Sequence, residues 1–296
     1  MRVLVVSLNP AVDQTITLNG FHPGQVNRAD TMHLHPGGKG VNVAGHLAAS
    51  GVETELVGFI GLENQSLFQQ HFDRLGIRAS CIGLPGATRT ALKLVDLEAQ
   101  RTTDINLPGL APQAEHLAAL NQLLSALLPG ADWLVCTGSL PPGMDADWYA
   151  GWIRRAREGG VKTALDSSGQ ALRLGVLQKP DLIKPNHAEL GELLGVDHPD
   201  QDLTTRAARR LAGAGIGLVA VSLGAQGGLF CTSGDCIHLP AVSIQVRSTA
   251  GAGDALLAGL ILGRLRGLNL EGCARLGMDY AGAAVARVDP SIPISL

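Results

Sequence analysis

The sequence predicts an α/β protein in which a mainly parallel β-sheet carries helices on both faces. Two observations support this prediction: short apolar runs indicate buried strands, and helical patterns occupy the segments between them. Strand–helix alternation is typical of parallel sheets, because parallel strands need crossover connections. The chain has 296 residues, of which 46% are hydrophobic; this is enough for one large domain with a substantial core.

The individual elements follow from this alternation. Apolar runs predict strands at residues 3–8, 55–60, 133–137, 163–165, 182–183 and 218–222. Helical periodicity predicts helices at residues 41–49, 65–75, 114–128, 146–158, 203–212, 255–266 and 270–286. We expect these elements to form a single domain that spans residues 1–296.

Two further segments, from about residue 12 to 34 and from about 88 to 107, break the alternation and predict a small second sheet. Both alternate polar and apolar side chains and contain no helical pattern. The second segment predicts a hairpin of residues 90–96 and 101–107 that turns at residues 98–100. We expect these strands to project from the main domain as a lid. The alternative is two ordinary surface hairpins.

Net charge and cysteine content limit the function classes. The formal net charge is −3, which argues against nucleic-acid and membrane-surface partners because both require a basic face. Five cysteines without a CxxC pair predict reduced thiols in a cytoplasmic protein. No apolar run reaches the roughly 18 residues of a membrane helix, and the apolar N-terminus predicts a strand and not a signal peptide.

The most informative segment is residues 249–259, where small residues precede an acid and an apolar run. The side chains of Gly251, Ala252 and Gly253 are small enough to let a ligand reach the backbone N–H groups at a helix start. Those groups carry partial positive charge and form an anion site. Asp254 is placed to act as a base beside a phosphoryl group in transfer. The alternative is a plain helix N-terminus that Asp254 stabilises through the helix dipole.

A second glycine-rich segment lies at residues 36–44. Its glycines, among them Gly38, allow backbone N–H groups to approach a polar ligand. Lys39 and Asn42 are three residues apart at a predicted helix start and can therefore share one face. The chain contains neither the GxxxxGK[ST] pattern of a P-loop nor the GxGxxG pattern of dinucleotide-binding proteins. The alternative is a tight turn that carries a solvated lysine.

Two later segments carry polar residues directly after predicted strands. Pro185 disfavours a helical conformation of Lys184, so that a helix starts after it, with Asn186 as N-cap and Glu189 in the capping-box position. Residues 222–228 lead from a strand end into a glycine-rich turn. Taken alone, the first segment is consistent with ordinary helix capping and the second with a hairpin turn.

Together these segments resemble the ribokinase-like carbohydrate kinases, the family that includes phosphofructokinase B. The resemblance covers nearly the whole chain and implies the ribokinase-like fold with a small β-sheet lid. Within the family, the chain is most similar to the bacterial 1-phosphofructokinases. This closer similarity rests on residues 8–13, 24–27, 37–44, 58–61, 64–65, 88–89, 138–141, 166–168 and 184–186.

The resemblance implies a catalytic role for the segment around Asp254. The Asp254 carboxylate would take the proton from the attacking sugar hydroxyl, while the N–H groups of Gly251, Ala252 and Gly253 hold the charge of the γ-phosphoryl group of ATP. Asn186 and Glu189 would arrange Mg²⁺, held largely through water. The nucleotide side would be lined by Lys184, Asn186, Ser222, Gly224, Ala225, Gln226, Gly227 and Thr249.

Other positions match substrate-binding residues of the family. The candidates are Asp13, Asn27, Gly38, Lys39, Asn42, Arg89, Lys93 and Ser139. Arg89 is the main candidate for binding a substrate phosphate, because a guanidinium binds phosphate through two parallel hydrogen bonds. Asn27 occupies a position that is typical of 1-phosphofructokinases, whereas phosphofructokinase B and tagatose-6-phosphate kinase tend to carry a basic residue there.

The resemblance therefore implies an ATP-dependent kinase that converts fructose 1-phosphate to fructose 1,6-bisphosphate by in-line attack of O6. A kinase for tagatose 6-phosphate or fructose 6-phosphate is the nearest alternative, and a non-catalytic sugar-phosphate sensor is an alternative of another class. The expected partners are the phosphosugar and ATP, and the exposed lid strands suggest a homodimer. Members of the family are expected to continue for roughly one helix beyond Leu296.

Overall fold

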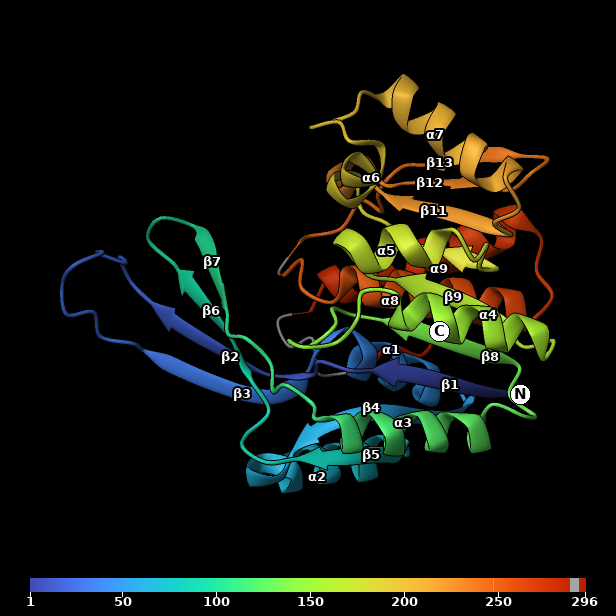
Figure 1. Ribbon diagram of the computed structural model, residues 1–296. Coiled ribbons are helices and arrows are strands. Elements are labelled where there is room, and N and C mark those ends of the chain that lie inside the picture. The colour runs from blue at the N-terminus through green and yellow to red at the C-terminus, as the bar shows by residue number, and fades with distance from the viewer. Residues whose placement is uncertain (247, 288–292) are drawn as a thin grey trace.

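The main sheet contains nine strands in the order β13-β12-β11-β10-β9-β8-β1-β4-β5 in the computed structural model, which describes residues 1–246, 248–287 and 293–296 (Figure 1). The bounds are β1 (Arg2–Ser7), β4 (Glu53–Gly61), β5 (Arg78–Leu84), β8 (Trp133–Thr137), β9 (Lys162–Asp166), β10 (Leu182–Ile183), β11 (Leu218–Ser222), β12 (Gly228–Cys231) and β13 (Cys236–Leu239). The strands from β11 to β5 pair in parallel, whereas β12 and β13 pair antiparallel at one edge. The predicted, mainly parallel sheet is confirmed.

Helices cover both faces because the central strands are apolar on both sides. Along β1, Val3 and Val5 belong to the core on one face, and Leu4 and Val6 belong to the core on the other. The first face carries α1 (Lys39–Ala49), α2 (Gln65–Leu75), α8 (Ala252–Leu265) and α9 (Leu270–Val285). The second face carries α3 (Ala114–Leu127), α4 (Trp148–Glu158), α5 (Gly169–Val176), α6 (His187–Leu194) and α7 (Gln201–Gly213). Short 3₁₀ helices occupy Leu62–Asn64 and Gly224–Gln226.

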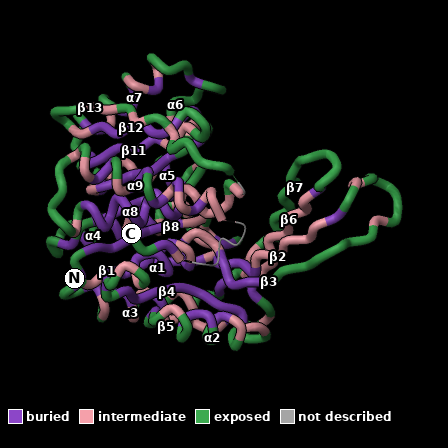
Figure 2. Tube along the Cα trace, turned by 180° about the vertical axis from the view of Figure 1, so that it is seen from behind, coloured by how far each residue is buried: buried purple, intermediate pink, exposed green. Residues whose placement is uncertain are grey.

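A second, four-stranded sheet forms the lid and projects from the main body (Figures 1 and 2). Its order is β3-β2-β6-β7, with β2 (Ala11–Leu18), β3 (Thr31–Gly37), β6 (Thr90–Asp96) and β7 (Arg101–Asn106). Each predicted segment forms an antiparallel pair, and the two pairs join through the parallel contact of β2 with β6. The two segments therefore form one lid and are not two separate hairpins.

The expectation that all cysteines are reduced is wrong for one pair. Cys231 and Cys236 form a disulfide between β12 and β13. The two residues are direct partners in the antiparallel register, which brings their Cα atoms to 4.0 Å. Cys81, Cys136 and Cys273 are free thiols. Within the described residues, no helix combines the length and the apolar character needed to cross a membrane.

Candidate active site

The candidate site lies where the parallel strands of the main sheet end. Asp166 is the last residue of β9 and Ser222 the last of β11, while Gly138 directly follows β8 and Lys184 directly follows β10. These four strands are neighbours in the sheet, so their carboxyl ends bring the four residues to one edge. Ligands of open α/β sheets bind at this edge. The fold thus brings together the predicted residues Lys184 and Ser222.

Two helices begin at the same edge without a side-chain cap. The N-cap residues are Gly38 for α1 and Gly251 for α8, with φ angles of 96° and 74°, a backbone region that favours glycine. In the part of the chain that the structure describes, no side chain accepts a hydrogen bond from the first N–H groups of either helix. These groups are therefore not occupied by side chains at the positive end of each helix dipole, although Ala252 N donates to the backbone oxygen of Thr249 at 3.4 Å. The anion site predicted at Gly251, Ala252 and Gly253 requires this geometry.

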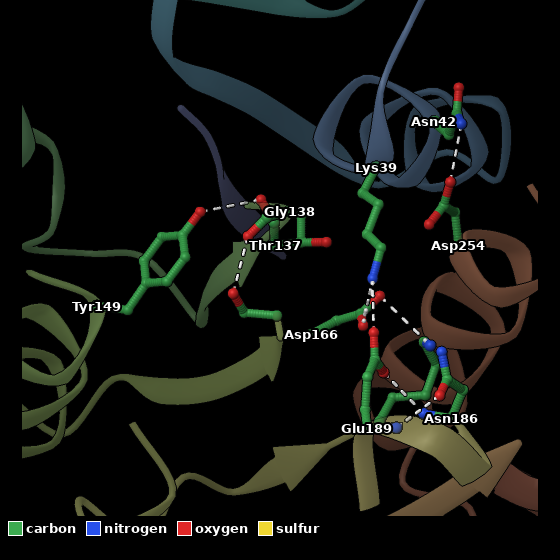
Figure 3. A network of polar contacts seen from close by, with 11 residues as sticks. Lys39, Asn42, Thr137, Gly138, Tyr149, Asp166, Asn186, Glu189 and Asp254 are labelled. Carbon is green, nitrogen blue, oxygen red and sulfur yellow. Dashed lines mark hydrogen bonds and ion pairs between the residues drawn. The ribbon is translucent and has the colours of Figure 1, made fainter. Parts of the chain in front are cut away.

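Asp254 lies in the first turn of α8 and is buried. Asn42 of α1 donates a hydrogen bond from Nδ2 to Asp254 Oδ2 at 2.8 Å (Figure 3). Burial and the neighbouring charge of Asp166 raise the pKa of Asp254 to about 6, against the hydrogen bond from Asn42 and the charges of Lys39 and Lys184. The carboxyl is therefore ionised at neutral pH and is more basic than an exposed aspartate, as a general base requires.

Asp166 holds two lysines beside this carboxyl. Lys39 Nζ lies 3.0 Å from Asp166 Oδ1 and 3.6 Å from Glu189 Oε1 (Figure 3). Lys184 Nζ lies 3.4 Å from Asp166 Oδ2. Burial lowers the pKa of Lys39, but the nearby carboxylates outweigh this effect and hold the pKa above its usual value. A Cβ at Gly253 would lie 3.2 Å from Lys184 Nζ. The Lys184 amine therefore reaches the predicted anion loop.

Asp166 is not among the predicted site residues, although it belongs to segment 166–168, on which the closer similarity rests. The available signal was an acid placed directly after the predicted strand 163–165. Because the carboxyl ends of parallel strands meet at one edge, a polar residue at such an end is as good a candidate site residue as a glycine-rich loop. Asp166 is almost completely buried, and its contacts with Lys39 and Lys184 place it at the centre of the charge cluster.

The predicted nucleotide-binding residues lie next to this cluster. The 3₁₀ turn Gly224–Gln226 follows β11, and its residues Ala225 and Gln226 are exposed. Ser222 donates its N–H to the backbone oxygen of Pro185 at 3.1 Å, which joins this turn to the start of α6. The backbone carbonyl of Thr249, also exposed, accepts from Ala252 N at 3.4 Å. Gly227 closes the turn with a φ of 88°.

Two of the predicted sugar-binding residues, Asp13 and Arg89, lie where the lid strands β2 and β6 begin. Arg89 donates from Nε and Nη2 to the backbone oxygen of Asn9 at 3.3 and 3.2 Å, and from Nη1 to that of Leu107 at 3.3 Å. Burial lowers the pKa of Arg89, and the charge of Asp13 raises it, so these two predicted residues lie close enough to interact. Asn9 also donates from Nδ2 to Ser139 Oγ at 3.1 Å.

A cleft opens beside Arg89 at the base of the lid. It is lined by Asn9, Thr88 and apolar side chains that include Phe59 and Leu84. Arg89 is among the residues that line this partly apolar cleft. Its role in phosphate binding stays a prediction.

Two predicted residues lie apart from this cluster. Lys93 is on the lid strand β6, where its Nζ is 3.6 Å from Asp104 Oδ1. Asn27 lies in the loop between β2 and β3, and its side chain donates to the backbone oxygens of His22 and Gln25, each at 2.9 Å. The amide of Asn27 therefore stabilises its own loop, and its role in substrate choice stays a prediction.

A model of the pfkB family of carbohydrate kinases matches residues 6–295. The chain belongs to this family. A 1-phosphofructokinase from Rhodobacter capsulatus is 43% identical over 294 residues, which cover 99% of this chain and 93% of the relative. A 1-phosphofructokinase from Escherichia coli is 38% identical over 298 residues, which cover 98% and 93% of the two chains.

Solved structures of pfkB-related kinases agree with the fold. Phosphofructokinase-2 from Escherichia coli in complex with substrates and products has a TM-score of 0.90 at 26% identity, with 98% of this chain and 97% of that chain covered. A tetrameric inhibited form of the same relative has a TM-score of 0.88 at 27% identity, covering 98% and 96%. Membership in the pfkB family makes this chain a sugar kinase that uses ATP.

The start of α6 carries the residues predicted to arrange a metal ion for this pfkB kinase. Asn186 and Glu189 form a capping box, in which Asn186 Oδ1 accepts from Glu189 N and Glu189 Oε2 accepts from Asn186 N, each at 2.8 Å. Glu189 Oε1 takes no part in the cap and lies 3.6 Å from Lys39 Nζ. Among the described residues, no three His, Cys, Asp or Glu side chains converge as direct metal ligands. Of the carboxylate oxygens at this point, Glu189 Oε1 lies outside the cap and fits contact with the water shell of a hydrated Mg²⁺, which keeps several of its waters.

Proposed function

We propose that this kinase transfers the γ-phosphoryl group of ATP to O6 of fructose 1-phosphate and releases fructose 1,6-bisphosphate and ADP. The observation that carries the transfer step is the position of Asp254 beside the uncapped start of α8. The choice of sugar is supported by two full-length relatives named 1-phosphofructokinases. Arg89, at the base of the lid, supplies a cation for the sugar phosphate.

Asp254 is the general base in this proposal. Its raised pKa of about 6 leaves it ionised at neutral pH, and burial removes competing water. The hydrogen bond from Asn42 holds Oδ2, so that Oδ1 is left to accept the proton of the O6 hydroxyl. The oxygen then attacks the γ-phosphorus in line, and the bond from the phosphorus to the β–γ bridging oxygen breaks without a covalent enzyme intermediate.

The start of α8 stabilises the charge on the transferred group. The N–H groups of Gly251, Ala252 and Gly253 precede the first helical hydrogen bonds, and donors fixed in this way contribute roughly 3 kcal/mol each to transition-state stabilisation. Lys184 adds a positive charge next to Gly253. Mg²⁺, arranged through water by Asn186 and Glu189, would neutralise phosphate charge on the nucleotide.

The lid and the residues at its base bind the sugar. Asp13 accepts hydrogen bonds from sugar hydroxyls, since a carboxylate has several acceptor sites, and Arg89 turns from the backbone oxygens of Asn9 and Leu107 to the phosphate. Lid closure over the sugar excludes water from the reaction centre and limits wasteful hydrolysis of ATP. The nearest alternative substrates, tagatose 6-phosphate and fructose 6-phosphate, carry their phosphate at the other end of the sugar.

A coupled ADP-release assay with MgATP tests this proposal. We expect kcat/KM for fructose 1-phosphate to exceed that for fructose 6-phosphate, tagatose 6-phosphate and free fructose by tenfold or more, which corresponds to about 1.4 kcal/mol of transition-state binding. Preference for a 6-phosphate would refute the choice of sugar and keep the role of Asp254. Binding of a phosphosugar without any ADP release would favour the sensor instead.

We also propose that two copies of the chain associate through the lid. Register places Ile16, Met32, Leu34, Leu92 and Ile105 on one face of the lid sheet, and Met32, Leu34 and Ile105 are exposed. The oligomeric relative described above supports a second copy of the chain as the partner. Sedimentation analysis should show a dimer for the unmodified chain and a monomer for Leu34→Asp; a monomer in both cases refutes the proposal.

A further inference from the structure

His35 faces a residue of the proposed sugar site from the neighbouring lid strand. His35 on β3 and Asp13 on β2 are direct partners in the antiparallel register, so their side chains project from the same face of the lid. His35 Nε2 lies 3.5 Å from Asp13 Oδ2. Within the described residues, this buried nitrogen has no hydrogen-bond partner. A buried polar atom without a partner is costly and calls for a physical explanation.

The contact with Asp13 determines which nitrogen of the His35 ring carries the proton. A nitrogen lone pair that faced a carboxylate would be repelled, so the proton of the imidazole belongs on Nε2, where it points toward Asp13. On the adjacent side, a Cβ at Gly37 would clash with Oδ2 of the Asp13 carboxylate. The carboxylate therefore occupies the space that glycine leaves open, with the His35 ring beside it.

We propose that His35 is a positioning residue that holds the Asp13 carboxylate for recognition of the sugar hydroxyls. The inference rests on the proposed function, in which Asp13 binds those hydroxyls. A shift of about 0.6 Å on lid closure would convert the present contact into a charge-assisted hydrogen bond. With Oδ2 held by His35, Oδ1 and the remaining lone pairs stay directed at the substrate, which lowers the ordering cost of binding.

His33 provides a matched control on the same strand. It lies two residues away, on the same face of β3, and its register partner is Thr15. His33 is exposed and has no carboxylate opposite it in the register. Loss of its imidazole changes the composition and charge of the lid in the same way as loss of His35, but it leaves Asp13 untouched.

The test compares His35→Ala, His35→Gln and His33→Ala by steady-state kinetics, and by calorimetric titration of fructose 1-phosphate without ATP. We expect His35→Ala to raise KM and the dissociation constant for the sugar about tenfold, the loss expected for one charge-assisted hydrogen bond. The values of kcat and of KM for ATP should change less than about twofold, because the proposed role of His35 concerns sugar binding alone. His35→Gln keeps an N–H donor near the position of Nε2 and should restore most of the affinity, and His33→Ala should bind like the unmodified chain.

A double substitution separates positioning from direct contact. In an Asp13→Asn background, His35→Ala should cause no further loss of sugar affinity, because its effect passes through the carboxylate. Additive losses, or an unchanged affinity in His35→Ala, overturn the inference, as does equal damage in His35→Gln and His35→Ala. If the unmodified chain prefers another phosphosugar, the proposed function fails, and the same comparison on that sugar still decides the role of His35.

Discussion

Replacing Asp254 with asparagine should lower turnover by about a hundredfold or more and at the same time stabilise the folded chain. The substitution keeps the size of the side chain and keeps an oxygen for the hydrogen bond from Asn42. It removes a carboxylate that the fold buries beside Asp166. Without a base, kcat should fall by about a hundredfold or more, while sugar affinity is retained.

The gain in stability follows from the pKa of the buried carboxyl. Burial and Asp166 raise the pKa of Asp254 from 3.8 to about 6. At 1.36 kcal/mol per pH unit, ionising this group in the folded state costs roughly 3 kcal/mol more than in the unfolded chain. Because the folded pKa is the higher one, the native state is favoured below about pH 4 and loses this advantage as the pH rises through about 6. Asp254→Asn should escape the penalty.

Urea unfolding at pH values between about 4 and 8.5 measures this difference. The free energy of unfolding of Asp254→Asn should exceed that of the unmodified chain by roughly 3 kcal/mol at pH 8 and by little near pH 4. Asp202→Asn is a matched control, because Asp202 also lies in a first helical turn but is exposed; it should show no gain. Equal stability of Asp254→Asn and the unmodified chain at pH 8 would refute the argument from burial.

Three other substitutions test the arrangement around this carboxyl. Asp166→Asn removes a charge that raises the pKa of Asp254, so the acid limb of kcat/KM, expected near pH 6, should move to lower pH; an unmoved limb would contradict the coupling. Gly253→Ala places a Cβ 3.2 Å from Lys184 Nζ and should lower kcat about tenfold by displacing the amine, with an unchanged melting temperature. Arg89→Ala should raise KM for the phosphosugar at least about tenfold and leave KM for ATP unchanged, and equal shifts in both values would argue against phosphate binding.

The fold was largely predictable because its central strands are buried on both faces. Such strands appear in the sequence as plain apolar runs, for example in β1 and β8. The strand β5 was not predicted because it lies at a sheet edge, is half-buried and includes polar residues. The lid was predictable from alternation of polar and apolar residues, but the parallel contact between β2 and β6 joins segments far apart in the chain. No local pattern indicates that contact.

Site residues that belong to a local sequence motif could be predicted from the sequence. Contacts between charged residues from different strands and helices could not. The roles of Lys184 and Asn42 stay predictions, yet the fold places both beside Asp254 or its loop. The contact of Lys39 with Asp166 joins residues 127 positions apart, and sequence spacing gives no sign of it. Asn27 is a local residue whose contacts were nevertheless not predicted. Its side chain forms hydrogen bonds within its own loop, and these depend on a loop conformation that the residue type does not reveal.

The charge balance of the cluster explains why a base can operate at the positive end of a helix. The start of α8, Lys39 and Lys184 all favour the ionised form of Asp254 and would by themselves make it a weak base. Asp166 pairs with both lysines and adds a like charge next to Asp254, and burial acts in the same direction. The lysines can therefore attract phosphate groups while the carboxylate stays basic. An acid at an anion site can act as a base under this balance, in which the proposed role of Asp166 is to pair with the lysines and to raise the pKa of Asp254.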